Sequence, residues 1–118
     1  MIRLSCPGSI RARGMVTAEI AVGMVALVML VAMVAGLAAT AELQARCLAS
    51  ASEIARFEVR DDTASADRAA ADVPAGAVVT RTREGALVVV VVRAPVKLAF
   101  LPMFWVEAKV ETLKEPDR

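Results

Sequence analysis

The longest apolar run of the chain extends over residues 20–41. It contains no charged side chain, and one carboxylate, Glu19, stands directly before it. As a helix, this run would be roughly 33 Å long at about 1.5 Å per residue, which is enough to cross the hydrocarbon core of a bilayer. The pattern therefore predicts a transmembrane helix segment over residues 15–41.

Helical periodicity continues beyond the apolar run. From Glu42 to Arg60 there is neither glycine nor proline, and Glu42 is spaced to pair with Arg46 one turn later. Apolar residues recur at three- and four-residue steps, as in an amphipathic helix, at Leu43, Cys47, Ala51, Ile54 and Ala55. We expect one helix from about Thr17 to Arg60, and we assign residues 42–62 to its extension outside the membrane.

Residues 63–118 predict a small domain that begins with a helix and continues with strands. Between the long helix and this domain, Asp61-Asp62-Thr63 consists entirely of residue types that cap helix ends. Residues 64–72 are rich in alanine and predict a short second helix. A stop and a turn follow at Val73-Pro74-Ala75-Gly76.

Beyond this turn the period changes from that of a helix to that of strands. Residues 78–83 alternate in part, residues 87–92 are a β-branched run that Pro95 should end, and residues 104–112 alternate cleanly. A continuous β-branched run such as residues 87–92 usually belongs to a central strand that is buried on both faces. With a tight turn at Glu84-Gly85, the pattern predicts an α+β fold, in which the amphipathic half of the long helix packs against about three antiparallel strands.

Positive charge is concentrated before Gly14. No acidic residue precedes it, but three basic residues do: Arg3, Arg11 and Arg13. This charge favours a cytoplasmic N-terminus, with the residues after the apolar run outside, and Pro7 and Gly8 should break any helix in this leader. Removal of the leader would leave 11 of the 14 basic residues against 13 acidic ones, a net charge of −2. Such a product has no basic surface for nucleic acid, so we expect no nucleic-acid partner.

The composition argues against an enzyme. The chain has no histidine and no tyrosine, which removes Ser-His-Asp and Cys-His catalysis and the commonest zinc ligand. The pair Asp61-Asp62 is more typical of helix caps than of a metal or acid–base site. We expect Arg81, Arg83 and Arg93 on a solvated strand face rather than in an anion site. The sequence therefore predicts no catalytic residue, no cofactor and no metal.

The two cysteines would lie on opposite sides of a membrane and cannot pair with each other. Cys6 lies in the leader, and Cys47 lies just past the apolar run. Cys47 is either a small buried apolar residue or a thiol available for an intermolecular link.

Small residues recur within the apolar run at four-residue spacing. Ala32, Gly36 and Thr40 form one such face, and Ala35 and Ala39 form another. Because small faces let a second transmembrane helix approach closely, Ala32, Gly36 and Thr40 are candidates for helix packing. The alternative is that alanine is simply abundant in this chain.

The stretch Gly14-Met15-Val16-Thr17-Ala18-Glu19, after a basic segment and before the apolar run, resembles class III signal peptides, the leaders of type IV pilins and pseudopilins. The resemblance implies that a prepilin peptidase cuts after Gly14, so that residues 1–14 are the leader and Met15 begins the mature chain. It also implies that the new amino group meets Glu19 of a neighbouring subunit and sets the register. Otherwise Glu19 would only mark the cytosolic border and complement the helix dipole.

The resemblance narrows to the TadE-like pseudopilins of tight-adherence (Flp-type) pili. Arg-Gly-x-x-Thr-x-Glu before a long apolar helix, and Ala51-Ser52-Glu53-Ile54-Ala55-Arg56 after it, are similar to that family, which commonly carries Arg-Glu-Gly-Ala-Arg there. This chain departs from the pattern at Ser52 and Ile54. The resemblance covers residues 11–60 and implies a minor pilin in the cell membrane. Its partners would be other pilins, the prepilin peptidase, the inner-membrane assembly platform and membrane lipid.

Two other interpretations remain open. Ala39-Thr40-Ala41 resembles the cleavage site of a secretory signal, although the apolar run is longer than the about 7–15 residues of a signal core and Glu19 interrupts its front. The main alternative is an unprocessed single-pass anchor, an adaptor with a small extracytoplasmic β-domain. The apolar stretch over residues 100–105 would serve as an interaction surface or would close the core against the long helix.

Overall fold

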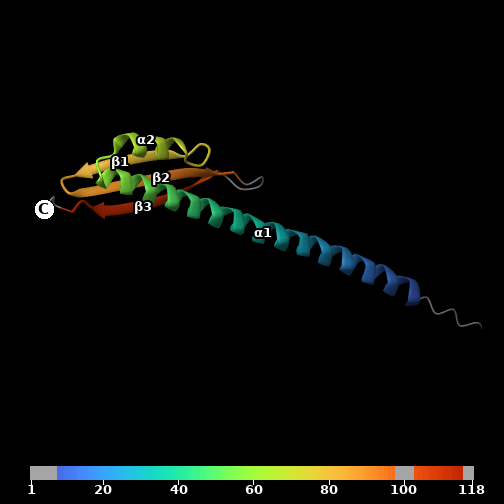
Figure 1. The fold of residues 1–118 in the computed structure, drawn as a ribbon. Helices are drawn as coiled ribbons and strands as arrows, with labels where there is room; N and C mark the ends of the chain where they lie inside the picture. Colours follow the sequence, from blue (N-terminus) through green and yellow to red (C-terminus); the bar gives the residue numbers. More distant parts are fainter. Residues whose placement is uncertain (1–7, 98–102, 116–118) are drawn as a thin grey trace, which may run out of the picture. The chain divides into compact units, whose positions relative to one another are not determined.

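The computed structural model describes residues 8–97 and 103–115, with side chains from residue 13 onward. Its elements, in chain order, are α1 (Gly8–Val59), α2 (Thr63–Ala71), β1 (Val78–Glu84), β2 (Leu87–Val96) and β3 (Phe104–Leu113) (Figure 1). The internal contacts divide the chain into two units, the first ending at Gly36 and the second beginning at Leu37. The predicted α+β fold is confirmed, because a long apolar N-terminal helix packs against a three-stranded antiparallel sheet.

The first unit contains most of the apolar run of α1, up to Gly36. Its large hydrophobic side chains are exposed, including Met15, Ile20 and Leu30. A helix in the core of a water-soluble domain would bury such side chains. Among the described residues, α1 is the one helix long and apolar enough to cross a membrane. The predicted membrane segment therefore coincides with a helix whose apolar side chains need an environment other than water.

α1 begins earlier than the sequence predicts. Gly8 is its first residue, so the prediction that Pro7 and Gly8 break any helix in the leader is wrong for Gly8. Pro7 lies outside the described residues. A glycine in the first turn is tolerated because the N–H groups there have no partner within the helix in any case.

α1 ends in a hydrogen-bonded turn that leads directly into α2. Asp61 adopts the left-handed conformation (φ 58°), and its N–H donates to the Glu58 carbonyl at 3.2 Å. The Asp62 N–H reaches the Phe57 carbonyl at 3.0 Å. These are the two bonds of a Schellman motif, here with aspartate where glycine is usual. Asp62 also caps α2 by accepting from the Ser65 N–H at 3.1 Å, which confirms the prediction of both aspartates as caps.

The three strands form an antiparallel sheet in the order β1-β2-β3, so β2 is the central strand, as predicted. A two-residue hairpin joins β1 to β2: Glu84 pairs with Leu87, and Gly85 has a φ of 61°. Glycine with positive φ at the first central position is what a type II′ turn requires. The prediction of a tight turn at Glu84-Gly85 is confirmed.

The prediction that Pro95 ends the central strand is wrong. β2 continues to Val96, and Pro95 pairs with Trp105 of β3. The ladder between β2 and β1 stops at Arg93, so β2 has a free edge on that side beyond this point. Proline is tolerated at a free edge because the N–H that it lacks has no neighbouring strand to bond.

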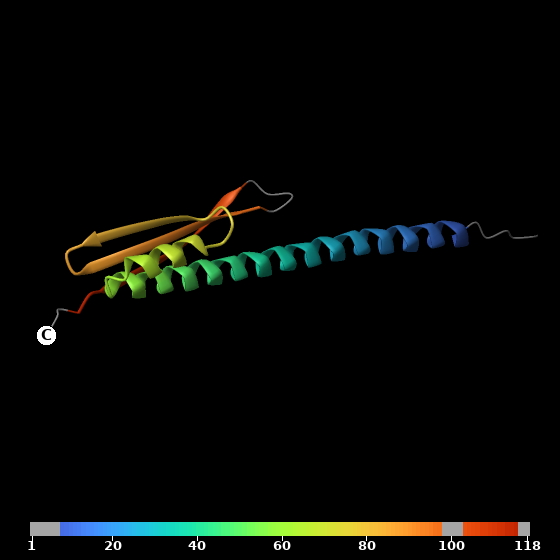
Figure 2. The same cartoon turned by 45° about the horizontal axis from the view of Figure 1, so that its top comes forward.

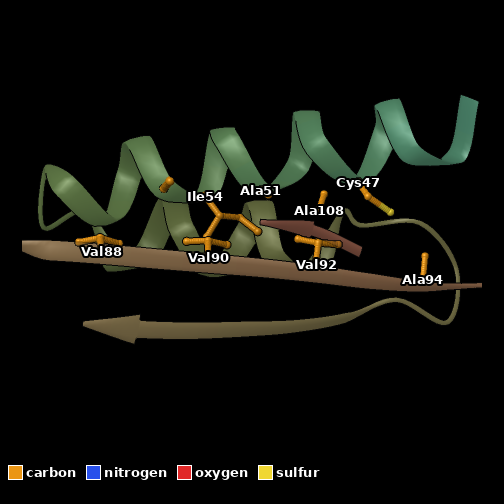
Figure 3. Close-up of a cluster of buried hydrophobic side chains, with 9 residues drawn as sticks. Cys47, Ala51, Ile54, Val88, Val90, Val92, Ala94 and Ala108 are labelled. Atoms are coloured by element: carbon orange, nitrogen blue, oxygen red, sulfur yellow. The ribbon is translucent and has the colours of Figure 1, made fainter. Parts of the chain in front are cut away.

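The core of the second unit lies between α1 and one face of the sheet (Figure 3). Four residues of the predicted apolar stripe of α1 are buried there, and Leu43 packs against them: Cys47, Ala51, Ile54 and Ala55. Alternate residues of β2 and one residue of β3 complete the cluster: Val88, Val90, Val92, Ala94 and Ala108. The amphipathic half of α1 is therefore held by burial of a single apolar stripe against β2.

Both helices of the second unit lie on the same face of the sheet (Figure 2). Asp67 of α2 pairs with Arg81 of β1 at 2.9 Å, whereas Gln44 Nε2 of α1 donates to the Glu107 carbonyl of β3 at 2.9 Å. α2 therefore lies toward β1. α1 lies toward β3 at Gln44, and its end reaches β1 through Glu58. On the opposite face Val89 of β2 is only half-buried, so the prediction that this strand is buried on both faces holds for one face.

A cluster of ion pairs joins the end of α1 to the sheet. Glu58, whose side chain is 14% exposed, pairs with Arg81 at 2.9 Å and with Arg83 at 3.4 Å. Asp61 pairs with Arg83 at 3.1 Å and also binds the Lys114 ammonium. Arg81 and Arg83 point to the face that the helices cover, but their side chains stay 37% and 45% exposed, so the predicted solvation holds while both also pair with carboxylates.

We expect the second unit to lose stability as the pH falls through the acid range. Lys114, and then Arg83, hold the pKa of Asp61 below its ordinary value of 3.8, and Ser65 lowers the pKa of Asp62 from the same value. Carboxylates with a depressed folded pKa stabilise the fold fully above the unfolded pKa, and this contribution is lost as the pH falls through the folded value. The urea midpoint, followed by circular dichroism in detergent, should therefore decrease below about pH 4.

The double variant Asp61→Asn/Asp62→Asn is the control for this prediction. It should be less stable than the native chain at neutral pH and should show a flatter decline in acid, because neither amide titrates. A decline as steep as that of the native chain would show that other carboxylates carry the pH dependence.

Candidate processing and assembly site

The predicted processing site lies within α1. Gly14 and Met15 are helical, and Thr17 Oγ1 donates to the carbonyls of Arg13 and Gly14, each at 3.0 Å. Such hydroxyl-to-carbonyl bonds compete with the backbone ladder and slightly destabilise a helix. The helical turn that contains the Gly14–Met15 peptide bond is therefore slightly weakened by the Thr17 hydroxyl, which bonds two of its backbone carbonyls.

Nothing in the described chain requires glycine at position 14. The residue has no positive φ, and a Cβ built on it meets nothing within 4 Å. Any ordinary residue would also have a higher helix propensity than glycine. Gly14 is therefore dispensable for the fold, and a requirement for glycine here would come from a molecule that acts on this site.

Glu19 is exposed and follows Met15 by about one helical turn. In the part of the chain that the structure describes, it makes no ion pair. Glu42, at the other end of the apolar run, pairs instead with Arg46 at 2.5 Å. A carboxylate within lipid costs a few kcal/mol unless it reaches the interface or a partner. Of the two carboxylates that border the run, Glu19 is the one whose charge remains available to another molecule.

The three residues predicted for helix packing differ in exposure. Ala32 is exposed, whereas Gly36 and Thr40 are half-buried. Thr40 belongs to the second unit and stands three residues before Leu43, which packs against the core. Ala32 is therefore the member of this face that remains accessible to a second helix.

Cys47 is fully buried in the core, in one cluster with Ala94 and Ala108 (Figure 3). Burial raises the pKa of its thiol, and the thiolate is the reactive form. The structure thus agrees with the interpretation of Cys47 as a small buried apolar residue. A link to another molecule would require α1 to separate from the sheet. Cys6 lies outside the described residues.

The stretch over residues 51–56, which carries part of the family resemblance, divides between core and surface. Its buried members are Ala51, Ile54 and Ala55, and its exposed members are Ser52, Glu53 and Arg56. The exposed members line a shallow hollow on the outer side of α1, beside Phe57. Ile54, one of the two departures from the family pattern, is the largest fully buried side chain among the described residues and packs in the core.

The apolar stretch over residues 100–105 is described from Met103 onward. Met103, Phe104 and Trp105 are all exposed, so the prediction that this stretch closes the core is wrong for these three residues. Arg93 stands over the Trp105 ring at 5.8 Å from its centroid and pairs with Glu107 at 3.3 Å. Of the three strand arginines, Arg93 is the one that lies on the uncovered face, as predicted. The exposure of these side chains leaves open the alternative prediction, that this stretch is an interaction surface.

No protein-family model matches the chain, and no curated protein or solved structure matches it either. The fold alone can therefore be compared with known types of protein. A long apolar N-terminal helix is followed by a small antiparallel sheet of three strands. This architecture is pilin-like. Within residues 13–97 and 103–115, no group of three or more acidic or cysteine side chains is placed to hold a metal ion.

Proposed function

We propose that this protein is a minor pilin or pseudopilin of the TadE-like type, which helps to assemble a tight-adherence (Flp-type) pilus. A prepilin peptidase would cut the chain after Gly14, on the cytoplasmic side of the cell membrane. The apolar part of α1 would remain in that membrane as a single span, and the second unit would lie outside the cytoplasm. The pilin-like architecture supports this proposal, and so does the open environment of Gly14.

The observation that carries the proposal is Glu19, which is exposed and has no ion pair among the described residues, at the front of an exposed apolar helix. Cutting after Gly14 would create an amino group at Met15, one turn away. In an apolar environment an amine and a carboxylate attract each other far more strongly than in water. An amine of one subunit and Glu19 of the next, offset along a helical stack, would therefore neutralise each other and set the register of assembly.

The second unit supports a minor role rather than that of the main shaft subunit. It adds α2 and a complete sheet to the long helix, whereas the major subunits of Flp-type pili are short and mostly helical. The partners in this proposal are other pilins, the prepilin peptidase, the inner-membrane assembly platform and membrane lipid. We propose no catalytic activity for the chain itself.

Mass spectrometry of the membrane-extracted protein tests the proposal. The native chain is expected to begin at Met15. The variant Gly14→Val should keep its leader completely, although its fold is unchanged, because the added side chain meets no neighbour within 4 Å. Gly23→Val is the matched control, since Gly23 lies in the same helix with equally open surroundings and should leave cutting unaffected.

The other outcomes distinguish the alternatives. A native chain that retains its leader would favour the unprocessed membrane-anchored adaptor. A chain that begins at Glu42 would indicate a secreted domain released from an ordinary signal sequence. Normal cutting of the Gly14→Val variant would exclude a prepilin peptidase as the processing enzyme.

A further inference from the structure

One end of the sheet exposes aromatic and basic side chains that the core does not use. We call this end the sheet tip, and it consists of the residues that flank the connection from β2 to β3: Lys97, Met103, Phe104 and Trp105. All four are exposed, Phe104 by 39% and Trp105 by 48%. Large apolar side chains gathered at the end of a small domain are typical of an interaction site.

Within the second unit, α1 and β3 run in the same direction, and positions along one can be matched to positions along the other. Near the start of both, Gln44 Nε2 bonds the Glu107 carbonyl at 2.9 Å. Near the end of both, Asp61 binds Lys114. The chain between these contacts covers about 25 Å along the helix, at 1.5 Å per residue, and about as much along the strand, at 3.4 Å per residue.

The same spacing locates the sheet tip relative to α1. Trp105 precedes Glu107 by two strand residues, or about 7 Å, which corresponds to about four or five helix residues before Gln44. Trp105 is therefore level with roughly residues 39–40 of α1. The apolar run ends at residue 41, so the sheet tip lies level with the predicted membrane border. These helix residues and the sheet belong to one compact unit.

The side chains of the sheet tip suit the boundary between lipid and water. Tryptophan prefers this boundary because its ring is apolar and its N–H is polar. Arg93 stands over the Trp105 ring, and Lys97 is exposed at the same end. The long stems of such cations lie along apolar surface while their charges reach lipid phosphates. The opposite end of the sheet holds instead the ion pairs of Asp61 with Arg83 and Lys114.

The two aromatic rings lie on opposite faces of the sheet, because successive residues of a strand alternate. Phe104 pairs with Val96 on the core face, whereas Trp105 pairs with Pro95 on the uncovered face. A flat protein surface would cover one of these faces and leave the other in water. A layer of lipid headgroups surrounds both, so the geometry favours lipid over a protein partner.

We propose that the sheet tip inserts among the lipid headgroups of the membrane that α1 spans, with Phe104 and Trp105 at the acyl boundary and Lys97 and Arg93 on lipid phosphates. This proposal rests on the proposed function, in which α1 is a membrane span. A subunit that waits in the membrane is then fixed at two places, along α1 and at the sheet tip. Its entry into a filament requires the second contact to break.

Trp105 is the only tryptophan of the chain, so its fluorescence reports on the sheet tip alone. The full chain is reconstituted into phosphatidylcholine–phosphatidylglycerol vesicles with or without bromine on the upper acyl chain. We expect bromine to lower the Trp105 emission by roughly twofold or more, with an emission maximum blue-shifted from that of water-exposed tryptophan, because the ring lies near the acyl boundary. Acrylamide, a water-soluble quencher, should have little effect on it.

The control variant Trp105→Phe/Leu113→Trp moves the fluorophore to the other end of β3. Leu113 is 71% exposed, so the substitution adds no clash, and Phe keeps an aromatic ring at position 105. This variant should be quenched by acrylamide and not by bromolipid. Equal bromolipid quenching of the two proteins would overturn the proposal. Protection of Trp105 from acrylamide without bromolipid quenching would also overturn it, because protein rather than lipid would then cover the ring.

Alkaline carbonate extraction of the same vesicles separates the two proposals. A chain that resists extraction while Trp105 remains in water contradicts the sheet-tip contact alone. A chain that is extracted contradicts the membrane span of α1, and with it both the proposed function and the sheet-tip contact.

Discussion

Replacing Glu19 by alanine is expected to leave membrane insertion intact and to abolish pilus assembly. Insertion should become easier, because the apolar run loses the carboxylate at its front, which costs about a few kcal/mol in lipid. Assembly should fail because the amino group at Met15 of the neighbouring subunit loses its partner. Glu19→Gln should fail likewise, since the amide keeps the size of the side chain and removes its charge. Electron microscopy and the amount of sheared pilus protein measure the outcome.

Glu42→Ala is the matched control for this result. Glu42 borders the other end of the apolar run, but it pairs with Arg46 of its own chain. An exposed pair of this kind is worth about 0–1 kcal/mol, so its loss should leave both insertion and assembly unchanged. Normal pili in the Glu19→Ala strain would contradict the register role. Loss of pili in both strains would show that assembly depends on charge at either end of the run and not on a specific pair.

The second large effect is expected for Ile54→Ala, which should destabilise the second unit by about 3–4 kcal/mol. Ile54 of α1 is fully buried against β2, in one cluster with Ala51 and Val90 (Figure 3). Truncation removes three carbon atoms from a site where rigid strands limit collapse, so a cavity remains. A small domain has only about 5 kcal/mol to lose, and the variant should therefore be partly unfolded. Urea unfolding of the detergent-solubilised chain, followed by circular dichroism, measures the loss.

Leu48→Ala provides the comparison within the same helix. It removes the same number of carbon atoms as Ile54→Ala, but Leu48 is 49% exposed on the outer side of α1. Its effect should stay within about 0.5 kcal/mol. Similar losses for the two variants would mean that helix propensity, rather than packing on the sheet, controls the stability of this half of α1.

Most of the fold is predictable because its elements differ in period. The apolar run and the stripe that ends at Ala55 repeat at helical spacing, and the residues after Gly76 alternate as strands do. The turn at Glu84-Gly85 and the cap residues Asp61 and Asp62 are local signals with a direct physical cause. Each of these features depends on a few adjacent residues, so no knowledge of distant contacts is needed to predict it.

The errors concern features that distant contacts decide. Pro95 remains within β2 because β1 has already stopped pairing at Arg93, and the sequence does not specify where the ladder ends. The pairing of Arg81 and Arg83 with Glu58, which the sequence analysis did not predict, arises because both helices cover one side of the sheet. A signal for this existed, since Glu58 stands four residues after Ile54 on the buried side of α1, and a carboxylate there needs a cation.

The same distinction between local signals and distant contacts applies to the candidate sites. Gly14, Met15 and Glu19 are predicted from a linear motif alone. The structure adds that glycine is unconstrained at position 14 and that Glu19 is exposed and unpaired within the described chain. The sheet tip was not predictable as a membrane contact. Its position depends on the level of β3 beside α1, which only the hydrogen bond of Gln44 and the ion pair of Asp61 reveal.

The outer edge of β3 has a consequence for aggregation of the protein. Strand borders with free carbonyls recruit strands of other molecules, but here Gln44 occupies the Glu107 carbonyl, and charges follow at Lys109 and Glu111. In the proposed function, copies gathered in one membrane would thus be kept from pairing sheet to sheet. Assembly through the helices, as proposed, would then meet no competition from pairing between sheets.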